Sequence, residues 1–216
     1  MQGKVNKYGY MENRDYTTRD TILNILKTNI KDEKDYNDLS SWLLSSGYFD
    51  APYTSEYQYS YDGGLAQYSL DVYNNLCTLV KDYTTENEID NTTLALVGLL
   101  HLVSKHNYYE PCVNNVKVYT PYGDKYDEVG NYTWYASKSY RVKDVSKRDA
   151  IGSLGIMSYM ILSRFVPLSE QGIMTLMYYN YTENTKDIYT LIRRYPLIAL
   201  LNCAITLTLN VTYRGE

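Results

Sequence analysis

The chain has 216 residues, with 21 Lys and Arg against 25 Asp and Glu, and a formal net charge of −4. This length is typical of one globular domain, so we expect a single domain over 1–216, with 1–15 as a candidate flexible segment. A hydrophobic fraction of 44% with 21% charged residues excludes general disorder. The mildly acidic balance, without a basic run, excludes a dedicated nucleic-acid-binding surface.

The cysteines and two stretches of sequence indicate where in the cell the protein is expected to be. Three widely spaced cysteines without a CxxC pair favour a reducing environment. The opening MQGKVNKYGYMENRD lacks an apolar core, which excludes a secretory signal. The uncharged stretch 195–213 begins near Pro196 and contains several Asn and Thr residues, so we expect a buried helix there and no membrane span. A cytoplasmic or virion protein that is not secreted is therefore expected.

Hydrophobic periodicity predicts helices along most of the chain. Thr17-x-x-Asp20 is typical of a helix start and predicts a helix reaching about Ile30. A second helix is predicted over 38–46, closed by Gly47, and a long amphipathic one over 64–83. The segment 92–105 is apolar on nearly all sides, which predicts the central helix of a bundle. Later helices are expected over about 151–164, 169–179 with Ser169 as N-cap, 187–194 and 196–209.

Between 107 and 148 the helical periodicity fails. Short alternating pieces surround Pro121-Tyr122-Gly123-Asp124 and Gly130-Asn131, which predicts a small β-hairpin around 113–136. No repeat or low-complexity linker divides the chain. We therefore expect a mainly α protein, a helical bundle with a small β-hairpin insert.

Tyrosine is strongly over-represented, with 27 Tyr against 2 Phe. The tyrosines gather in two segments, 48–61 and 119–140. Tyrosine combines a large rigid contact area with a hydrogen-bonding hydroxyl, which suits it to binding surfaces. The segments therefore indicate either an exposed surface for a protein partner or rings that fill the interior.

Groups able to support catalysis are few. The chain has two histidines, no Walker-type loop and no GxSxG motif. Gly63-Gly64 precedes a predicted helix, which indicates a tight turn rather than a phosphate loop, since such a loop needs more glycines and a Lys-Ser/Thr pair.

Five segments carry motifs that occur together, and in this order, in one enzyme family. They are WLLSSGYFDAPYTSEYQYSYDGGLAQYSLDVYNNL (42–76), ALVGLLHLVSKHNYY (95–109), KDVSKRDAIGSLGIMSYMIL (143–162), LSEQGIMTLMYYNY (168–181) and YPLIALLNCAITLT (195–208). Together they resemble the helices of bacterial and phage HD-domain metal-dependent phosphohydrolases. The resemblance implies an HD-like helical bundle built around a metal site that hydrolyses phosphoesters.

This chain departs from the family at the metal ligands. The positions of the family's metal-binding His and Asp are taken by Tyr68, Leu102, Ser153, Tyr179 and Ile205, and those of two further histidines by Gln58 and Asn202. Of the family's set, His101 and the nearby Lys105 are retained. Aliphatic side chains have no lone pair, and a neutral phenol is a poor ligand beside imidazole or carboxylate. The resemblance therefore implies a pseudoenzyme with no metal and no cofactor.

Two functions follow from the resemblance. The first is a catalytically inactive scaffold that binds another protein, in a phage setting as a host- or defence-directed binder or a virion component. The second is a nucleotide sensor or sponge that uses the former active-site cavity without hydrolysis. The candidate residues of that remnant pocket are Tyr68, His101, Lys105, Ser153, Tyr179 and Asn202.

Single residues of the pocket also have alternative interpretations. His101 is either a core histidine with satisfied hydrogen bonds or a ligand-binding group. Lys105 is either a phosphate-contacting cation or a solvated lysine at the end of a helix. A third function, an enzyme with relocated carboxylates such as Asp124, Asp127 or Asp149, has no paired spacing in its favour.

Overall fold

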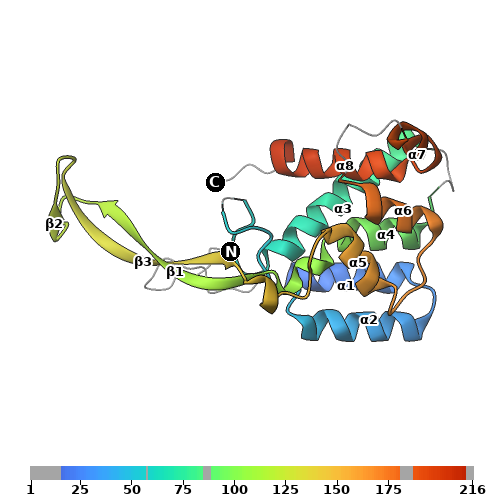
Figure 1. Cartoon of the computed structure of the whole chain (residues 1–216), viewed down its shortest axis with the longest axis horizontal. Helices are drawn as coiled ribbons and strands as arrows, with labels where there is room; N and C mark the ends of the chain where they lie inside the picture. The colour runs from blue at the N-terminus through green and yellow to red at the C-terminus, as the bar shows by residue number, and fades with distance from the viewer. Residues whose placement is uncertain (1–15, 57, 85–88, 181–186, 213–216) are drawn as a thin grey trace.

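The computed structural model describes residues 16–56, 58–84, 89–180 and 187–212. Its helices form one body, and a β-hairpin extends from one end of this body as a long arm (Figure 1). The prediction of a mainly α protein with a small β insert is confirmed. The candidate flexible segment 1–15 lies outside the described residues.

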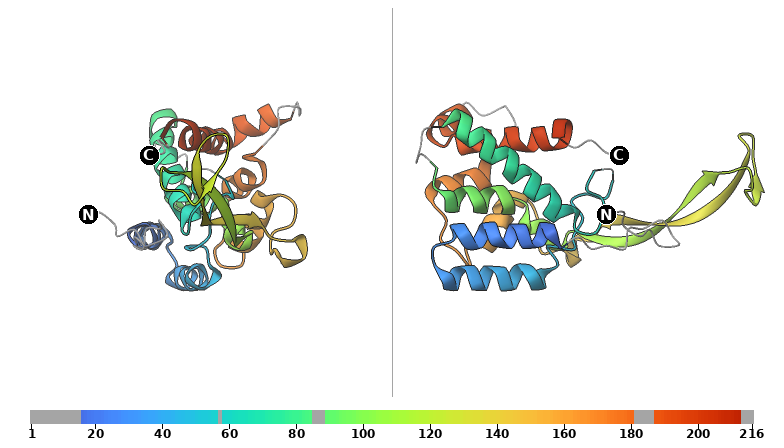
Figure 2. Two further views of the ribbon diagram at one scale, coloured as in Figure 1. Left: turned by 90° about the vertical axis from the view of Figure 1, so that its left-hand side faces the viewer. Right: turned by 180° about the vertical axis from the view of Figure 1, so that it is seen from behind.

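The helical body is arranged around two central helices. α3 packs against α1, α4 and α8, and α4 also packs against α6 (Figure 2). The helices are α1 (Thr17–Asn29), α2 (Glu33–Ser46), α3 (Gly64–Tyr83), α4 (Asn91–Leu100), α5 (Leu154–Leu162), α6 (Glu170–Tyr178), α7 (Ile188–Arg194) and α8 (Leu197–Leu207). Shorter turns are the 3-10 helices η1 (Val103–Asn107) and η2 (Val145–Lys147) and the π-helical turn η3 (Thr208–Thr212).

The central position predicted for the apolar helix is confirmed. Every residue of α4 from Thr93 to Leu100 is buried, because helices cover it on several sides. Burial of each large aliphatic side chain contributes about 1.5 to 3 kcal/mol. Within the described ranges, no single helix is long and apolar enough to cross a membrane; α7 and Leu197–Val211 meet that criterion only as a pair, which is bent by 98°.

Short polar side chains begin several of the helices. Asp32, Asp90 and Ser169 each accept a hydrogen bond from a first-turn backbone N–H, at 3.0, 2.8 and 3.1 Å. The N-cap predicted at Ser169 is therefore confirmed. The capping signal predicted at Thr17 is wrong, because Thr17 is already helical and the N-cap is Tyr16, without a side-chain cap.

Glycine sets two helix ends that the sequence indicated. Gly47 closes α2 at φ +86°, and Gly63 precedes α3 at φ +87°, a region that glycine adopts without strain. The tight turn predicted at Gly63-Gly64 is confirmed, as are the bounds of the helix over 64–83. The start predicted for α2 at residue 38 is wrong, because the N-cap at Asp32 begins the helix at Glu33.

Two further boundaries differ from the prediction for a structural reason. The helix expected over 92–105 ends at Leu100, because the backbone N–H of Ser104 bonds the Ser158 hydroxyl at 3.2 Å instead of continuing the helix. The helix expected from 151 begins at Leu154, after Gly152 at φ +88°.

The arm is longer than predicted. β1 (Tyr109–Tyr119) and β3 (Asn131–Val142) pair antiparallel along their whole length, and the short β2 (Lys125–Tyr126) joins β3 near the tip. At the base, the Tyr140 hydroxyl donates to Asp62 at 2.6 Å and Lys138 forms an ion pair with the same carboxylate. These contacts with the body extend the hairpin beyond the predicted 113–136.

The two tyrosine-rich segments have different environments. In the first, Tyr48 and Tyr59 are buried, and the Tyr48 hydroxyl donates to the Leu99 carbonyl at 2.9 Å. In the second, Tyr122 is 94% exposed and Tyr126 76% exposed on the arm. Interior filling therefore describes Tyr48 and Tyr59 of the first segment, whereas Tyr61 is exposed, and exposed surface describes the tip of the second.

Candidate functional site

A cavity of about 500 Å³ lies where α3, η1, α5, α6 and α8 meet. This volume is in the range of small-molecule sites, about 300 to 1,000 Å³. The structure brings together five of the six predicted pocket residues, from five separate segments. The five that line the cavity are Tyr68, Lys105, Ser153, Tyr179 and Asn202.

His101, the sixth, lies behind the cavity wall and is fully buried. Its Nδ1 is 3.1 Å from the Gly98 carbonyl oxygen, and its Nε2 is 3.3 Å from the Tyr68 hydroxyl. A carbonyl only accepts, so Nδ1 carries the proton and Nε2 accepts from Tyr68. Burial lowers the pKa of His101 to about 4, which keeps the ring neutral. His101 is therefore a core histidine that orients Tyr68.

Stacked tyrosines form one wall of the cavity. The Tyr53 ring stacks on Tyr68 with centroids 3.9 Å apart and planes at 22°. The rings of His101 and Tyr179 pack edge-to-face, with centroids 5.5 Å apart and planes at 81°. Burial raises the pKa of the Tyr68 and Tyr179 hydroxyls, so both phenols stay neutral. The wall offers rigid aromatic faces with hydrogen-bonding hydroxyls.

Lys105 lines the cavity from η1 and is half-buried. Its Nζ donates to the Tyr53 carbonyl at 2.8 Å and lies 4.2 Å from the centroid of the Tyr53 ring. Burial lowers the pKa of Lys105 from 10.5 to about 8. No carboxylate in the described part of the chain forms an ion pair with Lys105. The interpretation as a solvated helix-end lysine is wrong, and the cation faces the cavity without a counter-charge.

The N-terminus of α5 reaches the same cavity. Residues 152–155 all belong to the lining, and Ser153, the N-cap, makes no side-chain capping bond. The N–H groups of a first helical turn lack intrahelical partners and carry partial positive charge. An anion placed there would meet donors that the helix leaves open.

Close packing fixes this helix end beside Lys105. The Ser104 hydroxyl donates to the Leu154 carbonyl at 2.8 Å, which joins η1 to the first turn of α5. A side chain at Gly155 would bring its Cβ to 2.1 Å from the Leu176 carbonyl oxygen, so glycine is required where α5 meets α6. The two positive features are therefore held on adjacent, rigid segments.

The rest of the lining is polar but uncharged, or apolar. Asn180 and Asn202 line the cavity, and the Asn202 amide donates to the Tyr179 carbonyl at 3.0 Å. Leu102 and Ile205 supply aliphatic surface. No Asp or Glu occurs among the described residues that line it. The cavity is therefore electropositive and partly aromatic.

A divalent metal does not fit the donors present. The five positions that the resemblance assigns to metal ligands all line this cavity, but they carry Tyr, Leu, Ser, Tyr and Ile. Within 16–56, 58–84, 89–180 and 187–212, no three His, Cys, Asp or Glu residues come close enough to share a metal ion. Gln58 stays apart from the cavity and donates to the Leu209 carbonyl at 2.9 Å.

The carboxylates proposed for relocated catalysis lie elsewhere. Asp127 forms an ion pair with Lys117 on the arm, and Asp149 lies 3.1 Å from Nε2 of His106. Asp124 accepts from the Thr133 hydroxyl at 2.8 Å, also on the arm. None of the three lines the cavity.

No family model, curated protein or solved structure matches this chain.

Sequence reasoning missed two components of the site. The sequence pattern gives Tyr53 no place in the pocket, although its ring stacks on Tyr68 and its carbonyl accepts a hydrogen bond from Lys105. The N-terminus of α5 was expected three residues earlier. The signal that could have found it is Gly-Ser-x-Gly before an apolar helix, because such a start leaves its first-turn N–H groups accessible.

Proposed function

We propose that the protein binds a small phosphorylated aromatic molecule, of the nucleotide type, in this cavity and does not hydrolyse it. One observation carries the proposal. Lys105 and the N-terminus of α5 converge on a cavity whose described lining has no carboxylate.

Each part of such a ligand has a matching group in the cavity. A phosphate would meet the Lys105 ammonium and the open N–H groups of α5, both of which favour negative charge. An aromatic base would lie against Tyr53 or Tyr179, since the Tyr53 ring already covers Tyr68, and stacking of a base on an aromatic ring contributes about 1 to 3 kcal/mol. Asn180 and Asn202 provide both hydrogen-bond donors and acceptors for its polar edge.

The absence of hydrolysis is part of the proposal. Hydrolysis of a phosphoester needs an activated water, which a metal or a general base supplies. His101 is neutral, and both of its ring nitrogens are engaged by Gly98 and Tyr68. The described lining offers neither a carboxylate nor a metal-binding cluster. We therefore propose a pseudoenzyme that retains ligand without turning it over.

We also propose that the cavity corresponds to the active site of an ancestral HD-domain phosphohydrolase. The support is geometric: Tyr68, Leu102, Ser153, Tyr179 and Ile205, which the resemblance assigns to ligand positions, border a single cavity although they are far apart in sequence. Chance matches of short motifs would not be expected to converge in this way.

The test is a binding screen with nucleoside mono-, di- and cyclic phosphates, followed by calorimetry on any hit. A ligand that binds the folded state raises the melting temperature. The affinity of a bound nucleotide should fall at least about tenfold in Lys105→Met, because a hydrogen bond to a charged group contributes about 1.5 to 3 kcal/mol. Lys34→Met is the matched control, since Lys34 is solvent-exposed on α2.

Two results would contradict the proposal. If no member of the panel binds the wild type, the cavity does not serve nucleotide-like ligands. If a ligand binds and Lys105→Met keeps full affinity, the ligand does not use the cation on which the proposal depends. Release of phosphate from a bound nucleotide would contradict the claim that the protein does not hydrolyse its ligand, but it would leave the claim of nucleotide binding in place.

A protein-binding scaffold is the second candidate function, and the exposure of the arm favours it. Tyr122, Tyr126 and Trp134 present large apolar surface to solvent. Interface energy concentrates in a few aromatic anchors, so one good anchor cut to Ala costs about 2 kcal/mol or more of binding. A scaffold of this kind predicts that Tyr122→Ala and Tyr126→Ala weaken a purified partner's binding while leaving the melting temperature unchanged.

A further inference from the structure

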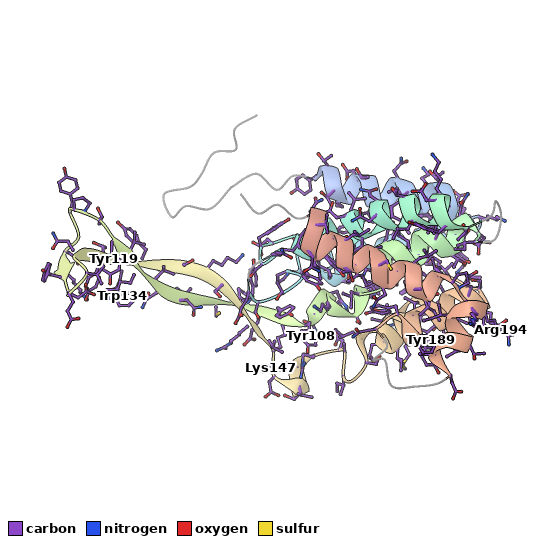
Figure 3. All side chains as sticks on the ribbon, turned by 90° about the horizontal axis from the view of Figure 1, so that it is seen from above. Tyr108, Tyr119, Trp134, Lys147, Tyr189 and Arg194 are labelled. Carbon is purple, nitrogen blue, oxygen red and sulfur yellow. The ribbon has the colours of Figure 1, made fainter. Side chains whose placement is uncertain are left out.

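The arm carries apolar surface that nothing in the described chain covers. It leaves the helical body as a thin ribbon with Tyr119 and Trp134 near its far end (Figure 3). A two-stranded hairpin is marginally stable in water and needs further strands or a packed face. The large apolar side chains exposed along its paired strands are Val113, Val116, Val118, Tyr119, Tyr126, Trp134, Tyr135 and Val142.

These side chains occupy both faces of the ribbon. Residues paired across the ladder share a face, so Lys117, Tyr119, Tyr132 and Trp134 lie on one side. On this side the Lys117 Nζ lies 3.8 Å from the centroid of the Tyr132 ring. Val116, paired with Tyr135, lies on the opposite side together with Val118. A partner that only covered one face would leave the other exposed.

The edge of the ribbon offers unpaired backbone groups. β1 is an edge strand in the order β1-β3-β2. The Lys143 N–H donates to the Tyr108 carbonyl and the Thr120 N–H to the Asn131 carbonyl, so even-numbered residues of β1 direct their backbone groups toward β3. Odd-numbered residues direct theirs outward.

The outward edge of β1 has a defined usable length. Nearest the body, Pro111 has no N–H and cannot donate to an added strand. Farther out, the odd residues from Val113 to Tyr119 have outward N–H and C=O groups without a partner among the described residues. The outer edge of β3 is more encumbered, because β2 pairs with its tip and the side chains of Lys138 and Tyr140 contact Asp62 of the body near its base.

We propose that two copies of this chain join through β1, antiparallel, about a two-fold axis at Val116. Each Val113 then pairs with Tyr119 of the second copy, and each Asn115 with Lys117 of the second copy. This register engages the outward N–H and C=O groups of all four odd-numbered residues from Val113 to Tyr119 in each copy and forms about eight backbone hydrogen bonds. The two ribbons become one four-stranded antiparallel sheet between the bodies.

Repulsion between lysines and the missing N–H of Pro111 favour this register over the two neighbouring registers. A shift of one step toward the tip would place Lys117 opposite the second copy's Lys117, and like charges directly opposite are unfavourable. A shift of one step toward the body would pair Tyr119 with Pro111, which lacks a donor. In the proposed register Val116 lies against the same residue of the second copy, which joins the apolar faces of the two ribbons.

The shape of the chain also favours a second copy as the occupant. The arm points away from the body in Figure 1 and in the right-hand view of Figure 2. Antiparallel pairing of two such arms puts the two bodies at opposite ends of the joined sheet, where they do not collide. An edge left free would instead be a template for uncontrolled strand addition.

Light scattering and sedimentation of the full chain, from low to high micromolar concentration, test the association. The wild type should shift from monomer to dimer. Asn115→Pro removes one outward N–H at the proposed interface and should leave the protein monomeric. Ala136→Pro is the matched control, because it removes an outward N–H from the other edge of the same ribbon and should leave the dimer intact.

Cysteine cross-linking tests the register. In a Cys112→Ser, Cys203→Ser background, which removes the exposed thiol of Cys203, Val116→Cys should form a disulfide dimer on mild oxidation, since facing residues at a two-fold axis lie about 4.5 Å apart between Cα atoms, within disulfide range. Val118→Cys should not, because its copies would be well over 7 Å apart. A wild type that stays monomeric, or a dimer that Asn115→Pro does not weaken, would overturn the proposal. Cross-linking through Val118→Cys instead would overturn the register.

Discussion

Replacing Lys105 by Met should stabilise the protein at neutral pH, although it removes a side chain that we assign to ligand binding. Burial lowers the pKa of Lys105 from 10.5 to about 8. A shift of that size means that holding the charged ammonium costs the folded state about 3 kcal/mol. The change also removes the bond to the Tyr53 carbonyl, whose loss costs about 1 to 2 kcal/mol. A net gain of about 1 to 2 kcal/mol is expected at pH 7.

The dependence on pH gives this prediction a sharper signature. Between pH 8 and 10.5 the unfolded chain keeps the Lys105 proton while the folded chain loses it. The unfolded state therefore binds more protons, and the stability of the wild type rises with pH through that window. Lys105→Met lacks this rise, so its advantage over the wild type should shrink between pH 7 and 9.5.

Urea unfolding of the wild type and of both lysine variants at the two pH values measures the effect. Lys34→Met, at an exposed position, should follow the wild type at both. Suppose instead that Lys105→Met destabilised the protein by a pH-independent amount. The lysine would then be stabilising the fold, and the reasoning from an uncompensated buried cation would be refuted.

Three further predictions concern the histidine and the tyrosines. The pKa of His101 is about 4 in the folded protein against 6.5 in the unfolded chain, so stability is lost as pH falls from 6.5 to 4. His101→Asn should remove roughly 2.5 kcal/mol of the loss measured by urea unfolding between pH 7 and 4.5. Because burial raises the pKa of Tyr68, stability present below pH 10 should be lost above it, and part of the tyrosinate signal in an ultraviolet titration should appear only together with unfolding. In thermal melts, Tyr48→Ala should cost about 3 to 5 kcal/mol and Tyr122→Ala less than about 0.5 kcal/mol, since the first ring is buried and the second is 94% exposed; equal losses would contradict the assignment of core and arm.

Helices with a clear apolar pattern could be predicted from the sequence. The spacing of their apolar residues places these side chains on the surfaces that pack against other helices. The helix over 64–83 and the buried segment from Thr93 to Leu100 are examples. The end of α4 could not be predicted. It depends on a bond between Ser104 and Ser158, two residues far apart in sequence.

The length of the arm and the fate of the tyrosines escaped prediction for a related reason. Near its base the ladder pairs Glu110 with Arg141 and Cys112 with Ser139, and these residues show no alternation of apolar and polar side chains. Nothing in the residue type separates a buried ring from an exposed one. The position of each tyrosine in the tertiary structure decides whether its ring is buried, since one tyrosine-rich segment lies in the body and much of the other projects from it.

The sequence predicted which residues line the candidate site better than it predicted the burial of the Lys105 charge. Motif order gave Tyr68, Lys105, Ser153, Tyr179 and Asn202, all of which line one cavity. The burial of the lysine could not be derived, because it requires the turn that carries Tyr53 to close over η1. An asparagine or tyrosine at a lost ligand position likewise does not indicate whether the space was filled or kept open.

The division of the molecule into body and arm gives it two separate optical reporters. The chain has two tryptophans. Trp42 lies in the body, with ring centroids 5.1 Å from His106 and 5.5 Å from Phe165. Trp134 is on the arm and 45% exposed. Replacing either one by Phe leaves a single emitter, so fluorescence can follow unfolding of the helical body through Trp42 and burial of the ribbon through Trp134 as independent signals.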